Sequence, residues 1–183
     1  MSRSTPANTR ELINTVLSDQ PVVTKTISSP LGVIILAAQG SVLLGVWFEG
    51  QRHFAGIEEA WVNQPDHPVL RMSEDQLKDY FAGRLAQFDL PLAPRGTVFQ
   101  RRVWQALLTI PIAKLTSYGE VARQLGAGRG VRAVAAAIGR NPISLIIPCH
   151  RVVAANGSLT GYAGGLDRKE QLLSLEERFH ASA

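Results

Sequence analysis

Residues 146–153, Ile146-Ile147-Pro148-Cys149-His150-Arg151-Val152-Val153, carry the reactive groups on which the interpretation of this 183-residue chain depends. Cys149 is the only cysteine in the chain. A free thiol has a pKa of about 8.5, and a neighbouring histidine or arginine lowers it toward a nucleophilic thiolate. The alternative is a buried, inert cysteine that packs as a small hydrophobe. On these residues alone both interpretations stay open.

A reactive Cys149 needs a base and a carboxylate that orients the base. We expect the segment to be extended, so that the side chains of Cys149 and His150 point to opposite sides. His150 then need not touch the thiol, and a water between them can carry the proton. Acids are scarce in the second half of the chain. The candidate carboxylates are Glu120, Asp167, Glu170, Glu176 and Glu177.

The single cysteine also excludes a disulfide framework and a cysteine-rich zinc site, and it fits a reducing compartment. The four histidines (53, 67, 150 and 180) show no ligand spacing, so we expect no metal and no cofactor. Met1–Asn8 lacks the apolar core of a secretory signal. No apolar run approaches the roughly 18 residues of a membrane helix. These features predict a cytoplasmic protein, nucleoid-associated if the source is bacterial, with no membrane partner.

The composition is 45% hydrophobic and 19% charged, which is typical of a globular protein and excludes disorder and fibres. Its net charge of +4 is unevenly distributed: residues 1–89 carry −3, residues 90–166 carry +8, and residues 167–183 carry −1. No acid occurs between Val121 and Leu166. The arginines of that segment are Arg123, Arg129, Arg132, Arg140 and Arg151. A single-sign block of this kind favours a polyanionic partner such as DNA over a solvated face, which usually mixes signs.

The first half of the chain has the pattern of a sheet with one helix. Val22–Ile27 predicts a strand, and 33–38 with 41–48 predicts an antiparallel hairpin around Gln39-Gly40. Residues 68–82 have helical spacing and end at Gly83. The Pro- and Gly-rich segment 90–96 predicts a boundary between a domain at 1–92 and a second domain at 93–183.

The second half has the pattern of short helices. Thr97 can cap a helix that runs to about Ile110, and Ser117 with Glu120 has the spacing of a capping box for a helix over 120–125. A glycine-rich turn at 126–130 leads to a second helix at 131–139, so the two form a helix-turn-helix candidate. Asp167-Arg168-Lys169-Glu170 repeats the capping pattern and predicts a last amphipathic helix.

Pro148-Cys149-His150-Arg151-Val152 resembles the active-site signature of the O6-alkylguanine-DNA alkyltransferases, the direct-reversal DNA repair family. The resemblance covers the C-terminal half strongly and the N-terminal half in outline. The further matching segments are Phe99-Gln100 with Val103-Trp104, Ser117–Ala122, Arg132–Val134, Gly139–Pro142, Thr160–Leu166 with Lys169-Glu170, and Tyr80–Gly83. The resemblance implies an α+β fold: an RNase H-like N-terminal domain of sheet and helix, then a helical winged helix-turn-helix C-terminal domain.

The family's mechanism implies a role for each matching residue. Cys149 attacks the alkyl carbon on guanine O6 and keeps it as a thioether, so each molecule works once. His150, oriented by Glu176, takes the thiol proton through a water. Asn141 holds the segment before Cys149 by hydrogen bonds, and Tyr118 donates a hydrogen bond or proton to the departing guanine. The implied pocket residues are Ile138, Val152, Tyr162 and Ala163.

The resemblance also implies the partner: double-stranded DNA containing O6-alkylguanine, bound through its minor groove by a monomer. Arg132 fills the stack vacated by the flipped nucleotide, since its guanidinium is cationic and planar. The implied DNA-binding residues are Arg132, Ala133, Ala136, Tyr118 and Arg123. Cooperative binding, the range of alkyl groups and activity on O4-alkylthymine stay open.

The chain departs from the family at Pro111-Ile112-Ala113-Lys114, where the glycine that usually follows the proline by two residues is missing. Two rival functions remain. One is a DNA-binding protein that flags alkylated bases without transfer, which is expected to lack the cysteine. The other is a cysteine hydrolase that uses Cys149 and His150 over many turnovers.

Overall fold

The computed structural model describes residue 12 and residues 19–181. The expectation of no secretory signal at Met1–Asn8 lies outside the described residues. Within the described part of the chain, no helix is both long and apolar enough to cross a membrane.

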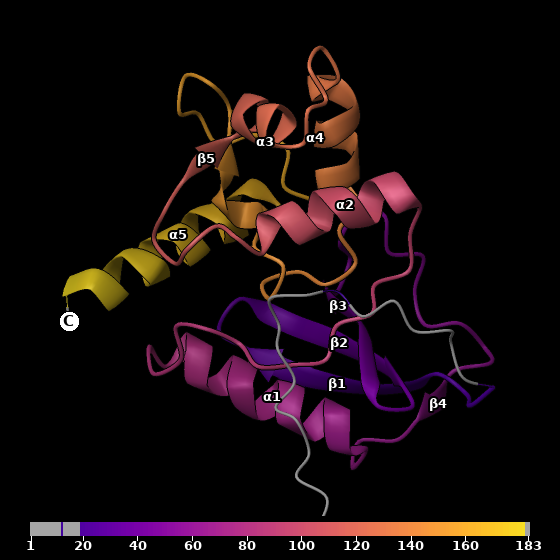
Figure 1. Cartoon of the computed structure of the whole chain (residues 1–183). Coiled ribbons are helices and arrows are strands. Elements are labelled where there is room, and N and C mark those ends of the chain that lie inside the picture. Colours follow the sequence, from indigo (N-terminus) through magenta and orange to yellow (C-terminus); the bar gives the residue numbers. More distant parts are fainter. Residues whose placement is uncertain (1–11, 13–18, 182–183) are drawn as a thin grey trace, which may run out of the picture.

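A four-stranded sheet forms the N-terminal half (Figure 1). Strands β1 (Val23–Ser29), β2 (Gly32–Gln39) and β3 (Val42–Phe48) form an antiparallel meander, and the short β4 (Val62–Asn63) pairs in parallel with β1. The expected strand and hairpin are therefore confirmed. Gly40 turns the hairpin with a φ of 56°, a conformation that glycine adopts without steric cost.

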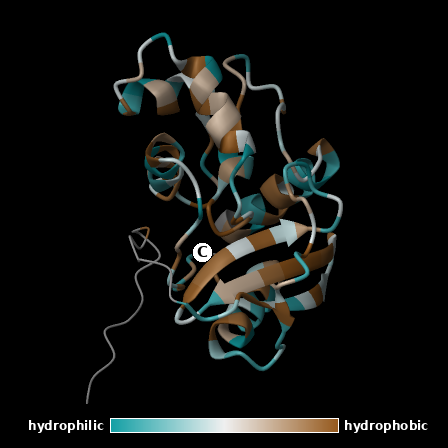
Figure 2. Ribbon diagram, turned by 90° about the vertical axis from the view of Figure 1, so that its right-hand side faces the viewer, coloured by the Kyte–Doolittle hydropathy of each residue, from teal (hydrophilic) through white to brown (hydrophobic). Residues whose placement is uncertain are grey.

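The two faces of the sheet pack differently because side chains alternate along each strand. Ile34 and Leu36 point toward α1 (Pro68–Phe81), whose buried hydrophobic residues belong to the same core cluster. Ile35 and Ala37 point to the other face and pack with Trp47 in a second cluster. Figure 2 shows hydrophobic residues along the strands of this sheet. The predicted helix over 68–82 is confirmed to within one residue.

The C-terminal half is built from short helices and two very short strands. Its elements are α2 (Val98–Leu107), β5 (Thr116–Ser117), α3 (Tyr118–Gln124), α4 (Val131–Gly139), the 3-10 turn η1 (Cys149–Arg151), β6 (Val152–Val153) and α5 (Leu166–Ala181). Helix α2 ends before the predicted Ile110 because the Thr109 and Ile110 amides bond three residues back, and Pro111 follows.

The observed helix caps agree in part with those predicted from the sequence. Thr97 and Gln100 form the full capping box of α2. Ser117 accepts from the Glu120 amide as predicted, but the Glu120 carboxylate pairs with Arg123 instead of reaching back. The predicted cap at Asp167 is wrong, because α5 begins at Leu166 and places Asp167 inside its first turn. There the carboxylate still interacts favourably with the helix dipole.

The two halves join along the edge strand β3. The Val46 amide donates to the Pro142 carbonyl at 2.9 Å, and the Ser144 amide donates to the Val46 carbonyl at 2.9 Å. The buried Gln51 side chain accepts from the Ser144 hydroxyl at 3.0 Å. The segment that leads to Cys149 therefore runs against the sheet and is fixed by it.

Candidate active site

Cys149 and its neighbours lie in a single 3-10 turn, so the expectation of an extended segment is wrong. The Arg151 amide donates to the Pro148 carbonyl at 3.1 Å and closes η1, and Pro148 supplies a fixed φ of −81° before it. All three residues of the turn are buried. The tight turn, rather than strand alternation, sets the directions of these side chains: His150 and Arg151 converge on Glu176, while Cys149 contacts Asn141.

Asn141 fixes the cysteine and the segment before it. Its amide nitrogen donates to the Ile147 carbonyl at 2.9 Å and lies 3.1 Å from the Cys149 sulfur, while its side-chain oxygen accepts from the Ile143 amide at 3.0 Å. Asn141 is buried at 3% exposure. One side chain thus holds the loop between α4 and η1 and also touches the thiol.

Glu176 is a buried carboxylate on which five hydrogen bonds converge. Oε1 accepts from His150 Nε2 (2.7 Å), Tyr80 Oη (2.7 Å) and Arg151 Nη2 (2.9 Å). Oε2 accepts from Arg151 Nε (2.9 Å) and the Ala113 amide (3.2 Å). Because an ionised carboxylate only accepts, His150 carries its hydrogen on Nε2. The other ring nitrogen, Nδ1, is buried without a hydrogen-bond partner among the described residues and keeps a free lone pair.

The charge states of the three groups fit a resting thiol beside a neutral base. Burial raises the pKa of Cys149, although the Asn141 contact opposes this. Burial lowers the pKa of His150 and outweighs the opposing effect of Glu176. Burial alone would raise the pKa of Glu176, but hydrogen bonds and charges from His150 and Arg151 hold it well below its usual range. Near neutral pH the site therefore contains a protonated thiol, a neutral imidazole and an ionised carboxylate.

Ala113 stands where the family's glycine is missing, and it keeps the glycine-like backbone. Its φ is 56°, in the left-handed region that costs a residue with a Cβ roughly 1–2 kcal/mol. The conformation directs its amide at Glu176 Oε2. The turn therefore holds its functional shape at the expense of strain.

We expect the Ala113→Gly variant to be more stable than the wild type by about 1 kcal/mol, because glycine relieves the left-handed strain. Chemical unfolding monitored by circular dichroism measures the change. The matched control is Ala135→Gly in the interior of α4, where the same substitution should destabilise by about 0.5–1 kcal/mol. A loss of stability in Ala113→Gly would show that the turn is not strained.

Lys169 and Tyr118 meet at the carbonyl of Thr160. The Lys169 ammonium is buried and donates to the Val152 and Thr160 carbonyls at 2.5 and 2.8 Å, and the Tyr118 hydroxyl donates to Thr160 at 2.9 Å. Burial lowers the pKa of Lys169 to about 8, against the influence of the Cys149 charge, which raises it. Gly161 has a φ of 66°, and a Cβ there would lie 2.8 Å from the Tyr118 hydroxyl, so the position requires glycine.

The loop after β6 carries Tyr162 and Ala163, two of the predicted pocket residues. The Ala163 carbonyl accepts from the Arg52 amide at 3.1 Å, which ties the loop to the N-terminal half. Tyr162 is buried, and the charge of Cys149 contributes to the raised pKa of its hydroxyl after burial itself, so the two groups lie close. Val152 and Ile138 are also buried, in one core cluster with Cys149.

Helix α4 presents the predicted DNA-binding residues on its outer face. Arg132, Ala133 and Ala136 are exposed, while Val134, Ala137 and Ile138 are buried against the rest of the domain. Figure 1 places α3 and α4 at the end of the molecule farthest from α1. Arg123 is exposed on α3 but pairs with Glu120.

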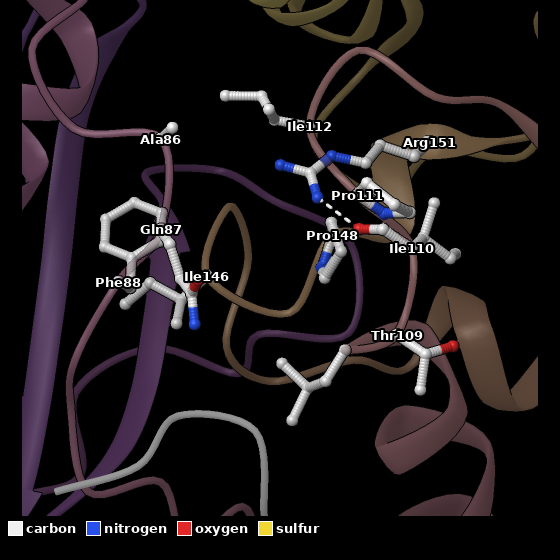
Figure 3. A pocket seen from close by; sticks show the side chains of 11 residues that line it. Ala86, Gln87, Phe88, Thr109, Ile110, Pro111, Ile112, Ile146, Pro148 and Arg151 are labelled. Atoms are coloured by element: carbon white, nitrogen blue, oxygen red, sulfur yellow. Dashed lines mark hydrogen bonds between the residues drawn. The ribbon is translucent and has the colours of Figure 1, made fainter.

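One member of the predicted basic block does not belong to that surface. Arg151 is buried at 7% exposure and bonds both Glu176 and the Ile110 carbonyl (2.6 Å), so counting it as a DNA-facing charge is wrong. Figure 3 shows this side chain beside a cavity of about 490 Å³. None of the four predicted pocket residues lines that cavity, and neither does Cys149. Within the described residues, no group of three or more His, Cys, Asp or Glu side chains is arranged to hold a metal ion.

The structure combines a buried thiol, a hydrogen-bonded histidine–glutamate pair and two short helices, α3 and α4, with the exposed Arg132 on α4. This is the arrangement expected of a DNA-binding protein with a cysteine nucleophile. Residues 22–94 match the ribonuclease-like domain of 6-O-methylguanine DNA methyltransferase, and residues 98–178 match its DNA-binding domain. The chain belongs to the O6-methylguanine-DNA methyltransferase family. The predictions of family, α+β fold and direct-reversal alkyltransferase function are confirmed.

The individual relatives agree with this assignment. A methylated-DNA–protein-cysteine methyltransferase of Mycobacterium bovis is 50% identical over 153 residues, which are 84% of this chain and 91% of the relative. One from Methanosarcina acetivorans is 47% identical over 81% of this chain and 94% of its own length. The crystal structure of Mycobacterium tuberculosis OGT in complex with DNA superposes with a TM-score of 0.80 at 48% identity, over 86% of this chain and 94% of that one. DNA binding is thereby supported for this chain.

Sequence reasoning missed three groups that touch the site. The sequence places Arg151 in the basic block and assigns no site role to Tyr80 or to the Ala113 amide. A signal existed on α5, where Lys169, Leu172 and Glu176 fall at i, i+3 and i+7 on one buried face. Two ionisable residues on an apolar helix face indicate a buried polar site. No local pattern could connect Tyr80 to Glu176, since the two are 96 residues apart.

Proposed function

We propose that Cys149 is the alkyl acceptor of a single-turnover repair reaction on O6-methylguanine in duplex DNA. The observation that carries this proposal is the buried thiol, in contact with Asn141 and followed directly by a histidine that is bonded to an ionised glutamate. A thiol with a raised pKa needs a base, and the free Nδ1 of His150 supplies one.

The chemical step is a displacement at the alkyl carbon. The thiol proton passes through a water to His150 Nδ1, and Glu176 stabilises the resulting imidazolium. The sulfur then forms a bond to the methyl carbon as the bond between that carbon and O6 breaks. Guanine leaves with the electron pair. The Tyr118 hydroxyl, which in the free protein donates to the Thr160 carbonyl, turns to donate a hydrogen bond or proton to the guanine. The thioether has no route back to a thiol, so each molecule acts once.

The pocket residues Ile138, Val152, Tyr162 and Ala163 would enclose the flipped base. The Cys149 and Val152 carbonyls would accept from the exocyclic amine, and the Ala163 amide would face O6. Asn141 positions the nucleophile. Pocket size around Ile138, Val152 and Ala163 would determine which larger alkyl groups, or O4-alkylthymine, are accepted.

The protein would bind DNA as a monomer, with the outer face of α4 in the minor groove. The small side chains of Ala133 and Ala136 would allow close approach to the sugar-phosphate backbone. Arg123 would contact the flank of the site. The relative solved with DNA supports the DNA partner, and exposure of these residues supports the face. The domain boundary proposed at residues 92 and 93 lies two residues inside the first family match, which ends at residue 94, and before the second, which begins at residue 98. We place the protein in the cytoplasm because its thiol must stay reduced and its substrate is chromosomal DNA.

Intact-protein mass spectrometry tests the function. The wild type, mixed with an oligonucleotide duplex containing O6-methylguanine under reducing conditions, should gain one methyl group, and peptide mapping should place it on Cys149. Cys149→Ala should gain none. Binding of the damaged duplex without any adduct on the wild type would favour the damage-flagging alternative. Turnover beyond one equivalent would favour a hydrolase.

We expect Arg132→Ala to slow methyl transfer from duplex DNA by about 10-fold or more, because base flipping costs a few kcal/mol and the vacated stack would no longer be filled. Transfer from a single-stranded oligonucleotide should change little, because no stack has to be opened. Single-turnover rates at saturating DNA measure both.

The matched control is Arg129→Ala, which removes an exposed charge from the turn before α4. It should weaken binding and reduce the salt dependence of affinity without slowing transfer at saturation. If Arg132→Ala slowed methyl transfer equally from duplex and from single-stranded DNA, Arg132 would have no role in base flipping.

A further inference from the structure

Tyr80 brings a group from the N-terminal half into the catalytic site. It lies on α1, and its hydroxyl donates to Glu176 Oε1 at 2.7 Å. Tyr80 and Glu176 are 1% and 0% exposed, so water cannot replace this bond. The acceptor is the same oxygen that binds His150 Nε2.

Three aromatic rings pack against the ring of Tyr80, which fixes the position of its hydroxyl. Its centroid lies 5.5 Å from that of Phe81, 5.3 Å from that of Phe88 and 6.0 Å from that of Phe179. Phe179 is on α5, the helix that carries Glu176. Aromatic pairs at these separations stabilise the fold beyond the effect of their buried area. The cluster therefore joins α1 to the catalytic helix and directs the hydroxyl at the carboxylate.

Tyr80 is a permanent donor. Burial, and after it the charge of Glu176, raises the pKa of the Tyr80 hydroxyl well above its usual value. The hydroxyl therefore stays protonated throughout the pH range in which the protein works.

We infer that Tyr80 is a positioning residue of the alkyl-transfer reaction: by hydrogen bonding Glu176 Oε1 it limits the charge that this oxygen offers to His150 and keeps the imidazole neutral, ready to accept the thiol proton. The inference rests on the proposed function. It assigns part of the chemistry to the N-terminal half, which otherwise contributes the sheet against which the Cys149 segment packs.

The physical basis is competition for one oxygen. A hydrogen bond to a full negative charge is stronger than one to a charge already neutralised by a cation. When His150 is protonated, its imidazolium takes up the charge on Oε1 and weakens the Tyr80 bond. Tyr80 therefore stabilises the state with neutral His150 more than the state with cationic His150.

The other charged and titratable groups around His150 come from the neighbouring elements. Arg151 on η1 and Lys169 on α5 disfavour a second positive charge, and Glu176 favours it. Cys149 lies on the same turn, and Tyr162 in the loop after β6 is close enough to interact with both Cys149 and Glu176. In addition to these groups, α1 contributes Tyr80.

The test is the pH dependence of the single-turnover rate for Tyr80→Phe, which removes only the hydroxyl. Methyl transfer from saturating duplex is quenched with acid and counted by intact mass between about pH 5 and 9, where histidine titrates. The acid limb of the wild-type profile reports the fraction of neutral His150. In Tyr80→Phe this limb should move to higher pH by about half a unit, so that the rate on the acid side falls about threefold relative to the plateau.

The matched control is Phe88→Leu, which loosens the same aromatic cluster and leaves the hydroxyl in place. It should lower the unfolding temperature while its acid limb stays at the wild-type pH. Replacement of Tyr80 by 3-fluorotyrosine, a stronger donor of nearly the same shape, should move the limb to lower pH. Because each profile is normalised to its own plateau, an unfolded fraction that is constant over the pH range does not shift it, and circular dichroism at each pH checks that it is constant.

The inference is overturned if the acid limb of Tyr80→Phe coincides with that of the wild type, or if Phe88→Leu shifts it equally. A wild type that takes up no methyl group would instead overturn the proposed function. The two failures are therefore distinguishable in one set of measurements.

Discussion

Glu176→Gln should lose at least about 100-fold, and up to about 10,000-fold, of its methyl-transfer rate, the usual contribution of an oriented general base. The amide removes the charge that stabilises the His150 imidazolium during proton transfer. It also presents an NH2 group where donors now converge, so at least one of Tyr80, His150 and Arg151 loses its acceptor. DNA affinity should stay near that of the wild type, because Glu176 is buried and away from the exposed face of α4.

The same substitution should cost about 3–5 kcal/mol of stability, since it leaves the buried Arg151 cation without its anion. The carboxylate's contribution also depends on pH. Its folded-state pKa lies well below its usual range, so the contribution is complete above the ordinary glutamate pKa of about 4.3 and is lost as the pH falls below it. Urea unfolding at neutral pH and under acid conditions measures both effects.

Glu177→Gln is the matched control for Glu176→Gln. Glu177 is the next residue on α5 and is exposed. The control should keep the wild-type transfer rate and lose less than about 0.5 kcal/mol, as surface substitutions do. If Glu176→Gln transferred methyl groups as fast as this control, another group would have to orient His150.

The sheet and the short helices were predictable because local patterns determine them. Alternation along 33–48 with a glycine turn gives the hairpin, and the Thr97 and Ser117 caps give the starts of α2 and α3. Helix ends do not follow from periodicity alone: the end of α2 depends on turn hydrogen bonds and on Pro111. The predicted cap at Asp167 is wrong for a similar reason: Gly165, with a φ of 96°, lies two residues earlier, and its carbonyl accepts the Lys169 amide at the start of α5.

The candidate site was predictable only where its parts are adjacent in sequence or belong to a recognisable family motif. Pro148-Cys149-His150 supplied the nucleophile and its neighbour, and the resemblance selected Glu176 among five acids. Of those five acids, Glu176 is hydrogen bonded to His150. The partners of Glu176 come from α1, η1 and the turn after Pro111, and packing alone brings them together. Composition likewise does not distinguish Arg151, which is the buried counter-ion of Glu176, from Arg132, which is exposed.

Lys169→Met should reduce methyl transfer by about 100-fold, because it removes a buried cation that has two separate functions. The ammonium bridges the carbonyl of Val152, a predicted pocket residue, and the carbonyl of Thr160, two residues before the predicted pocket residue Tyr162. Its charge also favours the Cys149 thiolate. Methionine keeps the length and the apolar stem, so the change removes charge and hydrogen bonds with little change in volume.

The two functions of Lys169 can be separated by measuring the thiol itself. The rate of reaction of Cys149 with a small alkylating reagent, followed against pH in the absence of DNA, gives the thiol pKa. It should be higher in Lys169→Met than in the wild type, because the nearby positive charge is gone. Any additional loss of transfer with DNA, beyond the loss of thiolate, measures the distortion of the pocket after the Val152 and Thr160 carbonyls lose their donor.

Lys114→Met is the matched control, because it removes the same charge from an exposed position of the C-terminal half. It should leave the thiol pKa unchanged and should affect DNA affinity only slightly, through the net charge. An unchanged thiol pKa in Lys169→Met, together with slow transfer, would restrict Lys169 to holding the pocket. Wild-type transfer in Lys169→Met would contradict both functions, because Tyr118 would then suffice as the donor to Thr160 and the Val152 carbonyl would need none.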